Sequence, residues 1–307
     1  MNTMKENILI TGGTGLLALN WALALRDKYN VYLVMHSRKI QLSGAFFVSF
    51  SLDDIDDIEA NIEKIKPKIV IHTAGLTSVE ECEANHDLAH HTNVVLAENI
   101  AKVCSKLNIT FVHISTDHLF AGNEMMLDEM HSLNPQNEYA KTKAEAEVRV
   151  INVNAKSLVV RTNFYGWGTT YRRSFSDMIF SELKSGKKLT LFHDVFYTPI
   201  YMGVLIQAID DLLKDNTVGI FNIVGDERLS KYQFGKKLAK RFGLDEALII
   251  KGDFAGQSNL IHRPSDMSLS NKKACNALDR ELGNVDEHLD MLYQDYESGL
   301  IQELQKL

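Results

Sequence analysis

The segment Thr11-Gly12-Gly13-Thr14-Gly15-Leu16-Leu17-Ala18 follows an apolar run, Ile8–Ile10, and leads into a helical pattern, Leu16–Asp27. A strand, a glycine loop and a helix in this order form the first unit of a dinucleotide-binding sheet, because free N–H groups at the helix start attract a diphosphate. Gly12 permits the tight turn, Gly15 lets the backbone approach the diphosphate, and Ala18 allows close helix–strand packing. We therefore expect Gly12, Thr14, Gly15 and Leu16 to contact a dinucleotide.

The first half of the chain alternates short β-rich runs with helical patterns. The runs are rich in Val, Ile and Phe and mostly lack alternating polarity, which is typical of strands buried on both faces. Besides Ile8–Ile10, the expected strands are Val31–Met35, Phe46–Ser49, Lys68–His72, Thr110–Ser115 and Ser157–Arg161, and the further helices are Ile55–Ile65, His86–Lys106 and Asn137–Val153. This order predicts an α/β fold of the Rossmann type, a doubly wound parallel sheet with ligands at the carboxyl ends of its strands.

After residue 163 helical patterns dominate. The expected helices are Phe175–Ser185, Val204–Lys214, Lys231–Phe242, Asn271–Ala277 and Glu287–Gln305, with short β pieces at Leu189–Phe192 and Ile220–Ile223. We expect residues 1–163 to form the nucleotide-binding domain and residues 164–307 a smaller C-terminal α/β lobe over the substrate. No Pro/Gly/Ser-rich linker separates them, so we expect one packed unit whose segments are free to interleave.

The bulk composition excludes several classes of protein. The 307 residues are 45% apolar without an apolar run of membrane-spanning length, and the polar N-terminus lacks the features of a secretory signal. The net charge of -7 argues against nucleic acid as a partner. The three cysteines, Cys82, Cys104 and Cys275, lack metal-site spacing and fit a reducing compartment. We expect a cytoplasmic protein without a membrane partner or a metal site; a homodimer is left open.

The residues after the second expected strand indicate which dinucleotide binds. An NAD enzyme usually has Asp or Glu there to bind the ribose 2′-hydroxyl. This chain instead reads Met35-His36-Ser37-Arg38-Lys39, without a carboxylate. Ser37 and Arg38 are suited to a 2′-phosphate, which Arg binds through paired N–H donors. The sequence therefore favours NADPH over NADH.

Residues with catalytic chemistry follow the fifth expected strand and open the next helix. Thr116 and Asp117 stand at the strand's carboxyl end, and Tyr139 and Lys143 share one helix face four residues apart. A cation beside a phenol stabilises the phenolate, so we expect Lys143 to lower the pKa of Tyr139 toward neutrality. Tyr139 is then a general acid for a carbonyl oxygen, and Thr116 orients that oxygen. A second Tyr-x3-Lys pair, Tyr232 and Lys236, lies far from any sheet end and is expected to be an ordinary helix face.

Several motifs in order resemble extended short-chain dehydrogenases/reductases, and among them dTDP-4-dehydrorhamnose reductases. The matching segments are Thr11–Ala18, Thr73-Ala74-Gly75-Leu76-Thr77-Ser78-Val79-Glu80, Ser115-Thr116-Asp117-His118-Leu119-Phe120-Ala121-Gly122, Asn134-Pro135 before Tyr139, Val160-Arg161-Thr162-Asn163, Thr198-Pro199 and Arg263-Pro264. The resemblance covers nearly the whole chain. It implies NADPH-dependent reduction of a nucleotide-linked 4-keto-6-deoxy sugar at C4.

The resemblance also implies residue roles. Tyr139 would donate the proton, Lys143 would bind the nicotinamide ribose, Thr116 would contact the sugar oxygen, and Asp117 would support that site. Further cofactor contacts would come from Thr73, Ala74, Gly75, Asn93 and Ser115, and substrate contacts from Thr77, Val79, His118, Asn163 and Arg263. His118 stands where the family has Tyr, and we expect it to pack against or steer the substrate.

Two other functions remain open at this stage. One is a nucleotide-sugar epimerase or dehydratase, although a dehydratase of this class would have Thr-Asp-Glu where this chain has His118 third. The other is a non-catalytic protein like the reductase-like regulatory subunit of methionine adenosyltransferase. Tightly retained NAD that cycles without net reduction would favour the first, and co-purification with a synthetase without turnover would favour the second.

Overall fold

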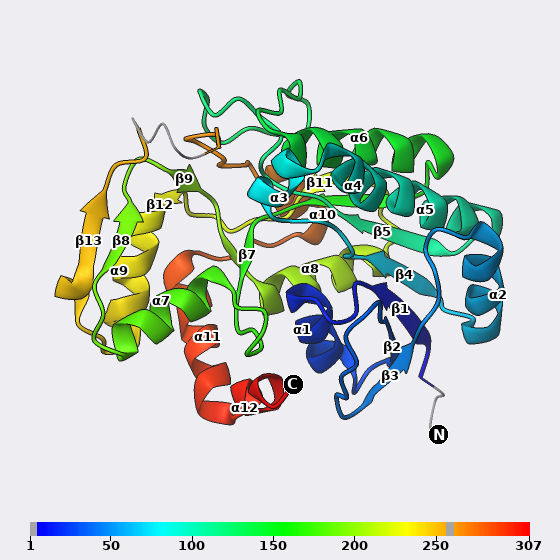
Figure 1. Cartoon of the computed structure of the whole chain (residues 1–307), viewed down its shortest axis with the longest axis horizontal. Helices are drawn as coiled ribbons and strands as arrows, with labels where there is room; N and C mark the ends of the chain where they lie inside the picture. Colours follow the sequence, from blue (N-terminus) through cyan, green and yellow to red (C-terminus); the bar gives the residue numbers. More distant parts are fainter. Residues whose placement is uncertain (1–4, 256–260) are drawn as a thin grey trace.

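A computed structural model describes residues 5–255 and 261–307 and shows a seven-stranded parallel sheet between two layers of helices (Figure 1). The strand order is β11-β6-β5-β4-β1-β2-β3. The strands are β1 (Asn7–Thr11), β2 (Asn30–Val34), β3 (Ala45–Val48), β4 (Ile69–His72), β5 (Thr110–Ile114), β6 (Leu158–Arg161) and β11 (Gly219–Asn222). The order reverses between β1 and β4, which is where such sheets bind ligands. The Rossmann-type fold predicted from the sequence is confirmed.

Apolar side chains fill both faces of the sheet. Alternate strand residues point to opposite faces, so Leu9, Val70 and Phe111 pack on one side, whereas Ile8 and Ile71 pack on the other. The first face is covered by α2 (Ile55–Ile65), α5 (Leu96–Lys106) and α6 (Glu138–Val153), and the second by α1 (Leu16–Leu25) and α8 (Met202–Lys214). Burial on both faces explains why the strands read as continuous apolar runs.

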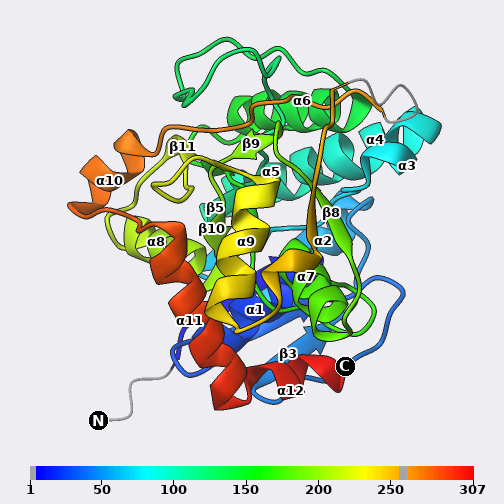
Figure 2. The same ribbon diagram turned by 90° about the vertical axis from the view of Figure 1, so that its left-hand side faces the viewer.

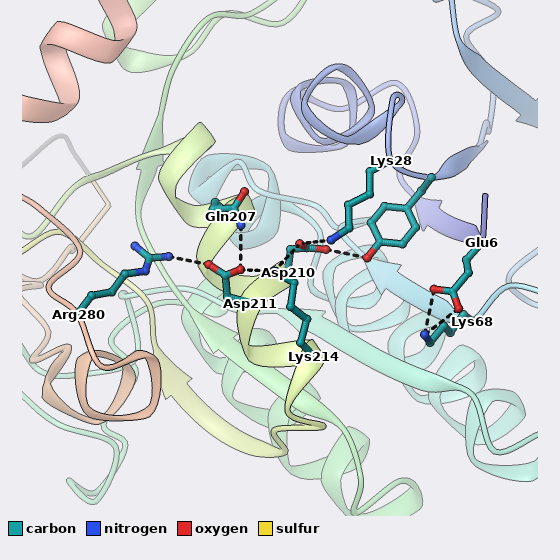
Figure 3. A network of polar contacts seen from close by, with 9 residues as sticks. Glu6, Lys28, Lys68, Gln207, Asp210, Asp211, Lys214 and Arg280 are labelled. Atoms are coloured by element: carbon teal, nitrogen blue, oxygen red, sulfur yellow. Dashed lines mark hydrogen bonds and ion pairs between the residues drawn. The ribbon is translucent and has the colours of Figure 1, made fainter. Parts of the chain in front are cut away.

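Two elements of the C-terminal half belong to this central layer. The strand expected at 220–223 in the smaller lobe is β11, and it pairs in parallel with β6 at the edge of the central sheet. Helix α8 packs on α1. Asp210 on α8 accepts hydrogen bonds from Lys28 Nζ (2.6 Å) and Tyr29 Oη (2.9 Å) after α1 (Figure 3). β11 and α8 follow residue 163 in the chain but belong to the central layer, which is the interleaving that the sequence analysis allowed. The division at residue 163 remains a proposal.

The described residues of the rest of the C-terminal half build three two-stranded sheets and further helices. Its elements are β7 (Phe164–Tyr165), α7 (Phe175–Lys184), β8 (Leu189–Phe192), β9 (Phe196–Tyr197), β10 (Ile200–Tyr201), β12 (Leu229–Ser230), α9 (Lys231–Arg241), a 3-10 turn (Glu246–Leu248), β13 (Ile249–Gly252), α10 (Lys272–Leu278), α11 (Val285–Ser298) and α12 (Leu300–Gln305). Figure 2 shows α11 leading into α12, where Glu303 accepts two hydrogen bonds from Arg26 at the end of α1. Among the described residues, no helix has the length and apolar composition needed to cross a bilayer.

The helix expected over His86–Lys106 is interrupted. It divides into α4 (His86–His90), a π-helical turn (His91–Val95) and α5, and a short helix that the sequence did not suggest, α3 (Val79–Ala84), precedes it. A π-turn widens the helix by one residue and re-aims the side chains around it. Here it lies beside α6, which carries Tyr139.

Candidate active site

The glycine loop has the geometry that a diphosphate needs. Gly12 has φ +67°, and a Cβ there would lie 2.9 Å from the Ala74 backbone, so only glycine fits. Gly15 begins α1 without a side-chain cap, and the first turn of α1 holds no acidic residue. The N–H groups at the start of α1 therefore remain free for an anion. Thr73 Oγ1 donates to Thr11 O (2.7 Å), which fixes the end of β4 against this loop.

Asn93 holds the segment after β4 in place. Its Oδ1 accepts from Leu76 N (2.7 Å), and its Nδ2 donates to Leu76 O (3.1 Å) and to Thr142 Oγ1 on α6 (3.0 Å). A Cβ on Gly75 would lie 3.0 Å from Asn93 Oδ1, so the contact is close. Asn93 thus lies against the segment after β4, and its polar atoms bond to the protein itself.

Thr116 and Asp117 lie buried directly after β5. Thr116 Oγ1 is 3.4 Å from Asp117 Oδ1, and Asp117 Oδ2 accepts from Asn163 Nδ2 at 2.6 Å. Asn163 follows β6, the neighbouring strand, so the two carboxyl ends meet at one edge of the sheet. Ser115 faces inward, because its hydroxyl donates to Glu147 Oε1 (2.6 Å). Ser115 therefore anchors β5 to α6.

Helix α6 presents Tyr139, Lys143 and Glu147 on one face. Asn137 sets its start, since Asn137 Oδ1 accepts from Ala140 N at 2.9 Å. Glu147 forms a fully buried ion pair with Arg161 on β6 (2.7 Å), which locks the helix to the sheet. Lys143 Nζ donates to Ile114 O at 2.7 Å. Tyr139 and Lys143 are therefore held at the carboxyl end of β5.

The expected effect of Lys143 on Tyr139 is not found in the structure. Burial raises the pKa of Tyr139 to about 12, with a hydrogen bond from Thr116 acting in the opposite direction. Burial also lowers the pKa of Lys143 to about 8, against the attraction of Glu147. Desolvation outweighs charge–charge stabilisation here, and the Lys143 ammonium is turned toward Ile114 O. Tyr139 is accordingly a neutral phenol at pH 7, which is the form a proton donor needs.

Two buried histidines connect the glycine loop with Lys143. His72 Nδ1 lies 2.9 Å from Thr11 Oγ1, the His72 and His113 rings stack at 5.5 Å, and His113 Nε2 lies 3.4 Å from Lys143 Nζ. Burial lowers the pKa of both rings, so they are neutral. The sequence analysis missed this row, although the consecutive sheet positions of Thr11, His72 and His113 follow from the strand register.

A group of polar residues surrounds His118. The His118 ring meets the Tyr139 ring edge-on at 5.7 Å, and its Nε2 lies 3.8 Å from Asp117 Oδ1. Burial lowers the pKa of His118, with the positive charges of Lys231 and Arg263 acting in the same direction. Arg263, an expected substrate residue, forms an ion pair with Glu80. His118, Asp117 and Tyr139 are thus brought together as predicted.

Lys231 is a site residue that the sequence analysis missed. Its Nζ lies 3.3 Å from the centroid of the Tyr197 ring and 4.9 Å from that of Phe175. Burial lowers its pKa to about 8, while Asp117 attracts its charge. A cation in the first turn of a helix opposes the helix dipole. Lys231 at the start of α9 is such a cation, and its unfavourable position was the one sign in the sequence that it has another role. The second Tyr-x3-Lys pair, Tyr232 and Lys236, lies on an ordinary helix face as expected, since Lys236 forms an ion pair with Glu246 at the surface.

The remaining predicted residues lie around the glycine loop and α3. Ser37 and Arg38 are exposed after β2, and Arg38 stacks on Tyr171. Thr77 Oγ1 accepts from Arg172 at 2.8 Å. Val79 is buried at the start of α3, so its side chain contributes to packing. The structure thus places the predicted residues in two groups, one at the glycine loop and one around Thr116 and Tyr139.

Comparisons with known proteins identify the family of the chain. Residues 4–298 match the RmlD substrate binding domain. The chain is 26% identical to the probable low-salt glycan biosynthesis reductase Agl14 of Haloferax volcanii, over 83% of this chain and 86% of that protein. It is 30% identical to methionine adenosyltransferase 2 subunit beta of Xenopus tropicalis (77% and 72%). It is 27% identical to dTDP-4-dehydrorhamnose reductase of Aggregatibacter actinomycetemcomitans (74% and 76%).

A solved structure shares the whole fold. The dTDP-4-dehydrorhamnose reductase of Bacillus anthracis, solved in complex with NADP, superposes with a TM-score of 0.83 at 23% identity, over 95% of this chain and 100% of that one. At this identity the likeness concerns the fold. The family match, in contrast, spans nearly the whole sequence, including every motif quoted above. The chain therefore belongs to the family of the RmlD substrate binding domain and is of the extended short-chain dehydrogenase/reductase type that its motifs predicted.

Proposed function

We propose that this protein is an NADPH-dependent reductase of the keto group of a nucleotide-linked sugar, with a 4-keto-6-deoxy sugar as the first candidate. The observation that carries the proposal is the meeting of Thr116, Tyr139 and Lys143 at the carboxyl edge of β5. The glycine loop opens at the same edge of the parallel sheet. A dinucleotide on the loop and a carbonyl at the hydroxyls would therefore be neighbours.

Each side chain then has a defined task. When bound, NADPH supplies the hydride. Tyr139 keeps its proton at neutral pH because its pKa is about 12, and it donates that proton to the carbonyl oxygen. Thr116 donates a hydrogen bond to the same oxygen as its negative charge develops. Asp117, held by Asn163, accepts the Thr116 hydroxyl proton in the structure, and this single proton turns to the carbonyl oxygen when substrate binds.

Lys143 and the glycine loop fit the cofactor. Ile114 O and His113 Nε2 lie within reach of two of the three protons of the Lys143 ammonium, which leaves the third for a ribose hydroxyl. The uncapped start of α1 fits the diphosphate, and exposed Ser37 and Arg38 fit a 2′-phosphate. We further propose a cytoplasmic location, which suits three cysteines that are all free.

Calorimetry with NADPH and NADH, followed by NADPH oxidation with a panel of nucleotide-linked 4-keto sugars, tests the proposal. We expect tighter binding of NADPH and oxidation by one panel member. Binding of neither nucleotide would refute the cofactor site. NAD that stays bound and cycles without net reduction would point instead to an epimerase or dehydratase.

One comparison favours a second candidate function. The similarity to methionine adenosyltransferase 2 subunit beta extends over most of both chains, so this chain is also a candidate non-catalytic subunit of another enzyme. The retention of Tyr139 and Lys143 weighs against this function. Pull-down with a synthetase, together with absence of turnover on the whole sugar panel, would favour it over the reductase.

A further inference from the structure

A turn from the C-terminal half lies directly on the cofactor loop. It spans residues 168–174, between β7 and α7 (Figure 1). Tyr171 Oη donates to Thr14 O at 3.1 Å. The next residue, Arg172, donates to Thr77 Oγ1 at 2.8 Å. The turn therefore contacts both segments that the proposed cofactor would touch, which are the glycine loop and the segment between β4 and α3.

The turn is held in one shape by its own hydrogen bonds. Thr169 N donates to Arg172 O (3.0 Å), and Arg172 N donates to Thr169 Oγ1 (3.0 Å). A Cβ on Gly168 would lie 2.2 Å from Arg172 O, so the turn requires glycine there. Asn20 on α1 donates to Trp167 O (2.8 Å) at the base of the turn. Tyr171 is thus presented from a fixed position.

The Tyr171 ring supports Arg38. The guanidinium carbon lies 3.9 Å from the ring centroid, which is stacking distance for a cation on an aromatic face. Within residues 5–255 and 261–307, no hydrogen bond or ion pair engages the Arg38 guanidinium. Stacking occupies its flat face and leaves its N–H edge free, and that edge binds a phosphate through paired donors.

We infer that Tyr171 is a positioning residue for cofactor choice, which orients Arg38 for the 2′-phosphate of NADPH. The inference rests on the proposed use of NADPH. A guanidinium already held in place loses less side-chain freedom when the phosphate binds, so binding is tighter. NADH lacks this phosphate and gains nothing from the stacking. Tyr171 should therefore affect the two nucleotides differently, whereas a residue needed only for the shape of the loop would affect both.

Calorimetric titration of the full chain with NADPH and with NADH tests this. We expect Tyr171→Leu to weaken NADPH binding about three- to tenfold, the cost of ordering one long side chain on binding, and to leave NADH binding within about twofold. Tyr171→Phe keeps the ring and should retain most of the preference. Arg38→Lys keeps the charge but loses the stacked plane, so it should lose the preference to a similar extent.

A double variant and a charge control complete the experiment. In an Arg38→Gln background, Tyr171→Leu should have no further effect on NADPH binding. Lys39→Gln, which removes a neighbouring exposed cation, should change the NADPH/NADH ratio by about twofold or less. Equal loss of both nucleotides in Tyr171→Leu, or no loss of either, would overturn the inference while the proposed function stands. Failure of the wild-type chain to bind NADPH would instead refute the proposed function.

Discussion

Replacing Lys143 with Met is expected to stabilise the fold at pH 7. Burial lowers the pKa of this ammonium from 10.5 to about 8, and that difference costs the folded state ~3 kcal/mol at neutral pH. The variant loses the hydrogen bond from the charged ammonium to Ile114 O, worth about 1.5–3 kcal/mol. The net gain is up to about 1.5 kcal/mol, or up to roughly 4 °C in melting temperature. Reductase activity should be lost, as is common when an active-site charge is removed to the benefit of stability.

Thermal melts at several pH values check both magnitude and sign. The pKa of Lys143 is lower in the folded state, so between pH 8 and 10.5 the unfolded state binds more protons and wild-type stability rises with pH. The variant lacks this rise, so its advantage is full below pH 8 and shrinks toward pH 10.5. Lys141→Met, an exposed change on the same helix, should show no such trend. A Lys143→Met variant that melts below wild type by the same margin at pH 7 and pH 9.5 would refute the reasoning.

Three further predictions concern the proposed chemistry and the fold. Tyr139→Phe should keep NADPH affinity but lower turnover a hundredfold or more; near-wild-type turnover would contradict its role as the acid. Arg38→Asp should shift preference toward NADH in competitive titration, because a carboxylate suits the free ribose 2′-hydroxyl, and an unchanged ratio would remove Arg38 from recognition. Asp210→Asn weakens the contacts with Lys28 and Tyr29 and should cost about 1–2 kcal/mol in urea unfolding; an unchanged midpoint would show that the network contributes nothing.

The elements of the central sheet were largely predictable, because burial on both faces leaves a simple pattern. The first six strands could be predicted from short apolar runs. The glycine loop after the first of them predicted that the cofactor binds at the carboxyl ends of the strands. The position of β11 could not be read this way, since an apolar run does not say which strand it will pair with. Its partner, β6, lies almost sixty residues earlier in the chain.

The interruption of the helix expected over His86–Lys106 could not be predicted from the sequence, for a different reason. A π-turn keeps an apolar face that looks helical in sequence, and its extra residue is seen only in the backbone of the folded helix. Side-chain identity predicted that Asn93 matters. It did not predict that its polar atoms would be occupied by the protein.

Within the site, motifs identified the residues but not their electrostatics. Spacing placed Tyr139 and Lys143 on one face, as the structure has them, yet the pKa of Tyr139 is raised because burial is a tertiary property. Lys231 and Tyr171 come from the C-terminal half and reach the site only through folding. Contacts between residues so far apart in sequence have no local signature.

The seventh strand and α8 have a consequence for how the chain acquires its structure during synthesis. Until residues 202–222 have left the ribosome, β6 has an unpaired edge and the apolar side of α1 lacks its covering helix. An unpaired strand edge beside exposed apolar surface invites aggregation. The nascent N-terminal half therefore cannot complete its core until β11 and α8 are made. A fragment that stops at residue 163 would lack the strand and the helix that cover this core.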